Sequence, residues 1–225
     1  MLILAADTSG KFGSIALAQC GPADDCRVLE VVPLTGGTFS AQLVPQIAAL
    51  LQKHGFKKED IEALAVASGP GSFTGLRVGL AAIKALAEVL GKPIAAVSLL
   101  EALAATAEAG KFFAALDAGR GEIYVAECER QCRAKPPLVL SERLLTKEEL
   151  ISAARDSMVI TPDKSIAALA TTAGVRVQEV ERPGSDAIAR IGWGKIQTRQ
   201  ISSPEALDAN YIRRSDAEIF AKMKP

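Results

Sequence analysis

Short apolar runs separated by polar turns open the chain. Residues 2–7 (LILAAD), 13–20 (GSIALAQC) and 27–34 (RVLEVVPL) each have the length and the composition of a strand. The connections between them are short and contain glycine or charged residues. This pattern predicts an antiparallel meander of three strands.

A helical spacing follows the meander. Residues 40–54 (SAQLVPQIAALLQKH) place Leu43 and Ile47 on one face together with two further leucines, and Ser40 is the expected N-cap. A continuous apolar run over residues 61–68 predicts a buried strand. After it we expect a helix over residues 73–91 and another buried strand over residues 93–98. Strands and helices in this order predict a mixed sheet flanked by helices.

The first hairpin has a counterpart in the second half of the chain. AADTSGKFGSIALAQC resembles AALDAGRGEIYVAEC (114–128), because both read as strand, aspartate, glycine turn, alternating strand and cysteine. Residues 15–20 align with residues 123–128 without a gap. Two unrelated hairpins would share some of these features, but the copies open halves of nearly equal length. We therefore predict two lobes, residues 1–108 and residues 109–225, with further helices in the second lobe over 146–157 and 185–197.

A duplicated α/β lobe that opens with a hairpin resembles the actin, hexokinase and Hsp70-like (ASKHA) nucleotide-binding fold. In that fold the two hairpins face a cleft and hold nucleotide phosphates and a metal ion. The resemblance implies Asp7, Ser9, Asp117 and Arg120 as candidate nucleotide contacts. For Arg120 a solvated turn position is the alternative.

The stretch SGPGSFTGLRVG (68–79) is rich in glycine but matches no standard phosphate motif. No Gly-Lys-Ser/Thr follows it, and its glycine spacing is not that of the dinucleotide fingerprint. Gly75 and Gly79 instead lie four residues apart in the expected helix, where each costs about 1 kcal/mol relative to alanine. Together with Ala82 they predict a notch for close approach of another backbone, either a partner helix or the protein's own sheet.

Charge and composition restrict the functional classes. The 225 residues carry 26 basic and 26 acidic side chains, so no overall field attracts the chain to nucleic acid or to a membrane. The start MLILAADTSG lacks the basic region of a signal peptide, and no apolar run is long enough to cross a bilayer. We expect a cytoplasmic location.

Cysteine and histidine usage argues against a metal site. The spacings of Cys20, Cys26, Cys128 and Cys132 match no common zinc pattern, although the two strand-end pairs could meet, and we expect reduced thiols. The single histidine, His54, stands at the expected end of a helix before Gly55, where it suits the helix dipole. One histidine excludes HExxH sites and makes a histidine-based triad improbable.

Four stretches together resemble the TsaB (YeaZ) family, the bacterial partner of TsaD in making threonylcarbamoyladenosine on tRNA. They are ILAADTSGKFGSIAL, SGPGSFTGLRVGL, PIAAVSLLEALA and LDAGRGEIYVAE, so the resemblance covers residues 1–128, with ANYIRR (209–214) as a further match. The related TsaD carries an H-x-x-x-H pair that binds the catalytic metal. Laid on VSLLEALA, these histidines fall on Leu99 and Leu103, which cannot ligate a metal.

The resemblance therefore implies a non-catalytic subunit with no metal site and no tightly bound cofactor of its own. The family reaction transfers a threonylcarbamoyl group to N6 of the adenosine that follows the anticodon. The implied partners are TsaD, TsaE and, through the complex, tRNA, with ATP or ADP and Mg²⁺ in that complex and a homodimer when TsaD is absent. The implied interface residues are Ser40, Leu43, Ile47, Phe73, Thr74, Gly75, Arg77, Val78, Gly79 and Ala82.

Two alternatives stay open. A stand-alone small-molecule kinase or ATPase of the same fold would use Asp7 and Asp117 around Mg²⁺, because phosphoryl transfer needs positioning and charge neutralisation rather than histidine. A peptidase is disfavoured, since the chain has neither ligand histidines nor a G-x-S-x-G nucleophile elbow.

Overall fold

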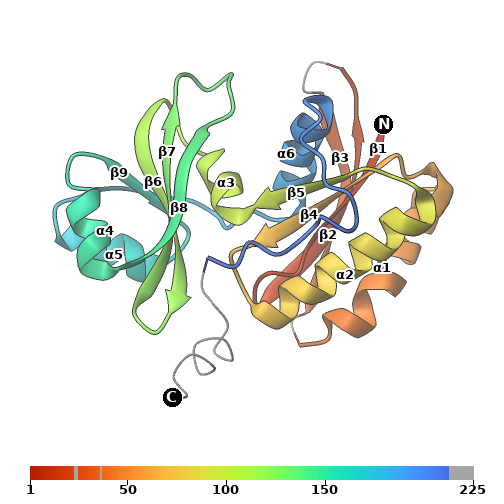
Figure 1. Ribbon diagram of the computed structural model, residues 1–225, viewed down its shortest axis with the longest axis horizontal. Coiled ribbons are helices and arrows are strands. Elements are labelled where there is room, and N and C mark those ends of the chain that lie inside the picture. Colours follow the sequence, from red (N-terminus) through yellow and green to blue (C-terminus); the bar gives the residue numbers. More distant parts are fainter. Residues whose placement is uncertain (23–24, 36, 213–225) are drawn as a thin grey trace. The chain divides into compact units, whose positions relative to one another are not determined.

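The computed structural model describes residues 1–22, 25–35 and 37–212 and consists of two compact units (Figure 1). The first unit contains Met1–Ser98 and Pro183–Asn210, and Leu99–Arg182 forms most of the second. Arg213 and Arg214, the last residues of the ANYIRR stretch, lie outside the described part of the chain.

The first unit is built on a mixed sheet with strand order β3-β2-β1-β4-β5. Its strands are β1 (Leu2–Asp7), β2 (Phe12–Cys20), β3 (Cys26–Thr35), β4 (Ala63–Gly69) and β5 (Ile94–Ser98). Its helices are α1 (Phe39–Lys53), α2 (Phe73–Leu90) and α6 (Ser185–Gln197), with a 3₁₀ turn at Lys58–Asp60. β1 pairs antiparallel with β2 and parallel with β4, which in turn pairs parallel with β5. The antiparallel meander and the mixed sheet predicted from the sequence are confirmed.

Alternation along the strands divides this sheet between two helical layers. Leu4 and Leu64 pack into the apolar core formed with α1 and α2. Their neighbour Ala65 instead meets α6, where a Cβ on Gly192 would overlap the Ala65 side chain. Figure 1 shows α1 and α2 side by side on one face of the sheet and α6 on the other. Small side chains on the α6 side therefore let that helix lie close to the sheet.

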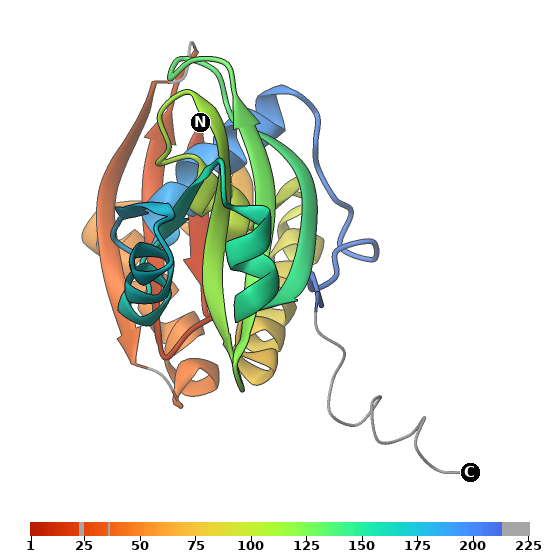
Figure 2. The ribbon, with the colours of Figure 1, turned by 90° about the vertical axis from the view of Figure 1, so that its left-hand side faces the viewer.

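The second unit repeats this plan with strand order β10-β9-β6-β7-β8. Its strands are β6 (Gly110–Gly119), β7 (Glu122–Arg130), β8 (Leu138–Thr146), β9 (Met158–Thr161) and β10 (Arg176–Glu179). Its helices are α3 (Leu99–Ala104), α4 (Lys147–Ala153) and α5 (Lys164–Thr172). Figure 2 views this unit from the side that α4 and α5 cover. Both halves follow the order strand-strand-strand-helix-strand-helix-strand-helix, which confirms the predicted duplication.

The last helix of each repeat packs on the sheet of the other repeat. α6 follows β10 in the chain but contacts β1, β2 and β4, and α3 follows β5 but contacts β6 and β7. The division consequently differs from the expected 1–108 and 109–225, since the boundary lies at Ser98 and residues 183–210 belong to the first unit. Hydrophobic pattern shows that a helix has an apolar face, but it does not show which sheet that face covers.

The expectation that all four cysteines are reduced is wrong for the two cysteines beside the β2–β3 turn. Cys20 and Cys26 lie opposite each other in the antiparallel pair and form a disulfide. Cys128 is a buried free thiol and Cys132 an exposed one.

None of the helices within residues 1–22, 25–35 and 37–212 has both the length and the apolar character needed to span a membrane.

Candidate functional site

Helix α2 begins directly after the glycine-rich stretch. The Ser72 side chain accepts a hydrogen bond from Gly75 N (3.3 Å), and Ser72 N donates to Ser9 O (2.6 Å). Gly91, in the left-handed conformation (φ 61°), ends the helix. The predicted helix over 73–91 is confirmed, with its start held to the β1–β2 turn.

The notch at Gly75 and Gly79 accommodates the protein's own turn. Thr8 Oγ1 donates a hydrogen bond to Gly75 O (2.7 Å). A Cβ at Gly75 would overlap Thr8 O, and one at Gly79 would overlap Thr8 Oγ1. Both glycines are buried. Their assignment to a partner interface is therefore wrong, and the close approach that the spacing predicted is made within the chain.

Two residues of α1 also correct the predicted interface. Leu43 and Ile47 are buried and belong to the core of the first unit, so they are not available to a partner. The helix begins at Phe39, with Thr38 rather than Ser40 at the N-cap position. Ser40 is exposed in the first turn.

The remaining predicted residues lie on the outer side of α2 or along its flank. Phe73, Thr74 and Arg77 are exposed, and the Arg77 guanidinium lies 3.7 Å from the centre of the Phe73 ring, a cation–π contact. Val78 and Ala82 are half-buried and pack against the core.

The structure adds exposed apolar residues on α1 and α2 that the sequence did not indicate. α1 contacts α2, so their outer sides belong to one helical layer of the first unit. Val44 is 57% exposed and Val89 75% exposed. We call the following exposed residues the α1–α2 face: Ala41, Val44, Pro45, Ala48, Phe73, Arg77, Ala81 and Val89.

The aspartates of the two hairpins form the same local turn. Asp7 Oδ1 accepts from Ser9 N (2.8 Å), and Asp117 Oδ1 accepts from Gly119 N (2.9 Å). Their positions in the hairpins nevertheless differ. Asp7 lies opposite Ser14 and is buried, whereas Asp117 lies opposite Ile123 beside a bulge and is exposed.

These aspartates lie in different units, Asp7 with Ser9 in the first and Asp117 with Arg120 in the second. Each carboxylate already serves its own turn. Ser9 Oγ is buried without a hydrogen-bond partner, and Arg120 has a left-handed backbone (φ 58°). Within the described residues, no three His, Cys, Asp or Glu side chains gather in a geometry that could hold a metal ion. Nucleotide contact by these four residues stays a prediction.

The positions that correspond to the relative's metal ligands are apolar and enclosed. Leu99 and Leu103 lie on α3 and are buried in the second unit. The one histidine is engaged elsewhere, because His54 Nε2 lies 2.8 Å from Glu30 Oε2, and Lys53 Nζ donates to Glu30 Oε1 (2.6 Å). These contacts, Lys53 first, hold the pKa of Glu30 below its ordinary value of 4.5. His54 follows the last residue of α1, as the sequence predicted.

A family model and curated proteins match this chain. The model described as "TsaD: tRNA N6-adenosine threonylcarbamoyltransferase" matches residues 31–181. The chain is 38% identical over 129 residues to the tRNA threonylcarbamoyladenosine biosynthesis protein TsaB of Bacillus subtilis, covering 55% of this chain and 53% of that protein. It is 36% identical over 134 residues to the protein of the same name in Escherichia coli, covering 58% and 56%. The chain thus matches about half the length of these curated relatives.

Solved structures extend the similarity over nearly the whole chain. YeaZ from Pseudomonas aeruginosa is 26% identical with a TM-score of 0.75, covering 93% of this chain and 100% of that chain. The activator of 2-hydroxyisocaproyl-CoA dehydratase from Clostridium difficile, solved with bound ADPNP, is 9% identical with a TM-score of 0.51, covering 89% and 97%. At that identity only the fold is shared, and it confirms the predicted duplicated ASKHA-type α/β fold.

Proposed function

From the premise that the chain belongs to the TsaB (YeaZ) branch of the family that the TsaD model describes, we propose that it is a non-catalytic subunit in tRNA threonylcarbamoyladenosine biosynthesis. Its role is to bind and order TsaD, the subunit that transfers the threonylcarbamoyl group to N6 of the adenosine following the anticodon. We place this role in the cytoplasm.

The non-catalytic role is supported by the side chains at the position of the relative's metal ligands. Leu99 and Leu103 have no donor atom and are buried. His54 is paired with Glu30 on β3, an edge strand of the first sheet. No other imidazole exists in the sequence to replace the missing pair.

The observation that carries the proposed partner binding is the α1–α2 face. Monomeric proteins rarely expose large contiguous apolar patches, and such patches often mark interfaces. Here two helices that contact each other expose Val44 and Val89 together with several alanines. Phe73 and Arg77 add an aromatic ring and a guanidinium, residue types enriched in the centres of interfaces. The same face would serve a homodimer when TsaD is absent.

Nucleotide and RNA enter the proposal only through the complex. Within the described residues no three His, Cys, Asp or Glu side chains gather in a geometry that could hold a metal ion, and Asp7 and Asp117 lie in different units. In this proposal, ATP or ADP with Mg²⁺ is bound by the assembly with TsaD and the ATPase TsaE. The 26 basic and 26 acidic residues give the chain no overall positive field, which supports the proposal that tRNA is bound by the assembled complex.

A binding measurement with purified TsaD tests whether the α1–α2 face contacts TsaD. Val44→Glu and Val89→Glu place a charge at exposed positions of the α1–α2 face and should weaken binding by at least about tenfold in titration calorimetry. Leu138→Glu, a change at a 61% exposed leucine on β8, is the matched control and should leave the affinity unaltered. Gly75→Leu is not a suitable variant, because it would displace Thr8 within the chain itself.

Equal affinity of both α1–α2 variants and native protein would contradict the assignment of this face. Absence of any binding between native protein and TsaD would contradict the proposed function itself.

A further inference from the structure

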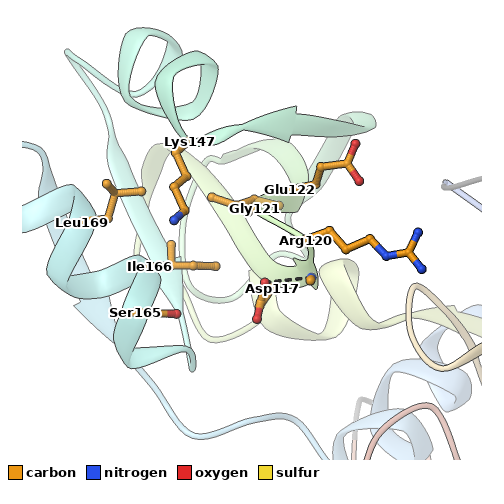
Figure 3. A pocket seen from close by; sticks show the side chains of 10 residues that line it. Asp117, Arg120, Gly121, Glu122, Lys147, Ser165, Ile166 and Leu169 are labelled. Atoms are coloured by element: carbon orange, nitrogen blue, oxygen red, sulfur yellow. Dashed lines mark hydrogen bonds between the residues drawn. The ribbon is translucent and has the colours of Figure 1, made fainter.

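A cavity of about 230 Å³ lies beside the β6–β7 turn of the second unit (Figure 3). The turn supplies one wall, including Asp117. Lys147, the first residue of α4, supplies another, and Ser165, Ile166 and Leu169 of α5 complete the lining.

In the first unit, side chains fill the corresponding space beside the β1–β2 turn. There the first residue of α1 is Phe39, which is buried against Gly13, and Thr8 fills the notch in α2. The second unit has a lysine at the first position of α4 in place of that phenylalanine. α5 has Ile166 where α2 has Gly75, counted from the start of each helix, so no notch admits the turn. The duplicated fold thus closes this corner in one copy and leaves it open in the other.

Among the charged residues that line the cavity, Lys147 and Asp117 do not pair with each other. Figure 3 shows the Lys147 ammonium reaching into the cavity from α4 and the Asp117 side chain standing at the turn. Among the described residues, Lys147 forms no hydrogen bond or ion pair, with Asp117 or with any other side chain. Asp117 accepts one hydrogen bond, from Gly119 N, and a carboxylate can accept several. Arg120 and Glu122 point away from the cavity (Figure 3).

Apolar side chains form one part of the lining, and the space is small. Ile166 is buried and Leu169 half-buried, and both line the cavity. Sites for drug-sized ligands hold about 300–1,000 Å³, so this cavity suits a smaller molecule. An anion without a positive group would meet the Asp117 carboxylate, and a neutral ligand would form neither ion pair.

We propose that this cavity binds a small zwitterion with an apolar side chain, that is, a free aliphatic α-amino acid. Its carboxylate pairs with Lys147, its ammonium group pairs with Asp117, and its side chain covers Ile166 and Leu169. Ser165 adds a hydroxyl at the rim.

Titration calorimetry of the full chain with L-leucine as the probe tests the proposal. Leucine should bind saturably, whereas 4-methylpentanoate, which lacks the amine, and isoamylamine, which lacks the carboxylate, should each bind at least about tenfold more weakly. Absence of saturable leucine binding overturns the proposal, and so does equal affinity for the three ligands.

Two variants test whether the leucine carboxylate contacts Lys147 and the leucine ammonium group contacts Asp117. Lys147→Met keeps the aliphatic stem and should bind leucine and isoamylamine equally, because the carboxylate has lost its partner. Asp117→Asn keeps an acceptor for Gly119 N and should bind leucine and 4-methylpentanoate equally. Lys164→Met, at the exposed first position of α5 outside the lining, is the control and should keep native affinity. Native leucine affinity in Lys147→Met contradicts the proposed contact even if leucine binds.

Discussion

Arg130, at the end of β7, holds the following loop and the end of α3 through its guanidinium group. The residue is buried. Its Nε, Nη1 and Nη2 donate hydrogen bonds of 2.6–3.2 Å, and the acceptors are the backbone oxygens of Ala105, Ala107, Cys132, Arg133 and Lys135. A planar group with five N–H donors can satisfy this many carbonyls at once, whereas lysine cannot.

Replacing this side chain should destabilise the second unit. Arg130→Met leaves five buried or partly buried carbonyl oxygens without these donors, and we expect a loss of about 3 kcal/mol in the free energy of unfolding measured with urea. Arg133→Met is the control, since that side chain is 81% exposed and its change should cost less than about 0.5 kcal/mol. Equal stability of the two variants would show that the guanidinium does not support the loop.

Glu30 makes the stability of the first unit depend on pH. Its pKa is lowered by hydrogen bonds from Lys53 and His54, so the folded state favours the ionised carboxylate. This contribution is fully present above the ordinary pKa of 4.5 and is lost as the pH falls through the lowered value. Glu30→Gln should therefore have a lower urea midpoint than native protein at neutral pH, and the gap should narrow as the pH falls below 4.5. A gap that stays constant over this range would contradict the ion cluster.

Strands and long helices follow closely from the apolar pattern of the sequence. β1, α2 and α6 begin within one residue of the expected positions, because buried alternation and helical spacing leave little freedom of register. β8 was not predicted. It is an edge strand whose Leu138 and Leu140 are exposed, so no buried face marks it in the sequence.

Alanine substitution should destabilise the protein at Gly75 and stabilise it at Gly194. Gly75→Ala would gain helix propensity, yet the new methyl overlaps Thr8 O, so we expect net destabilisation of at least about 1 kcal/mol. Gly194 lies in α6 with open space around its Cβ position, and Gly194→Ala should stabilise by about 0.5–1 kcal/mol. Thermal unfolding of both variants provides the comparison. A stabilised Gly75→Ala would mean that the turn does not pack into α2.

The cysteines should differ sharply in reactivity. Burial raises the pKa of the Cys128 thiol to about 12, and the Cys20–Cys26 disulfide has no thiol, so native protein should be alkylated at Cys132 alone near pH 8. Under denaturing conditions without reductant, mass spectrometry should show two alkylated thiols, and four after reduction. Four thiols in the unreduced denatured protein would contradict the disulfide.

The duplicated architecture was predictable from the whole chain, but its division into units was not. Two similar hairpins revealed the repeat, and the common strand order confirms it. The exchange of α3 and α6 between the repeats depends on tertiary packing that no local pattern records.

The candidate interface was predictable only in part. The apolar stripe of a helix packs against the core of its own unit, as Leu43 and Ile47 of α1 do. Such a stripe therefore does not mark a partner interface. The exposed side of α1, with Ala41, Pro45 and Ala48, has no periodic signal that separates it from an ordinary surface. Likewise, Gly75 showed that a backbone approaches α2, without showing that Thr8 supplies it.

The most direct test of the central claim is reconstituted modification of an unmodified tRNA transcript, with threonylcarbamoyl-adenylate as donor. The purified chain alone should form no threonylcarbamoyladenosine, and product should form when TsaD and TsaE are added together with it. Omission of the chain from that mixture should abolish most of the product. Formation of threonylcarbamoyladenosine by the chain alone, or undiminished product in its absence, would contradict the assignment of a non-catalytic and required subunit.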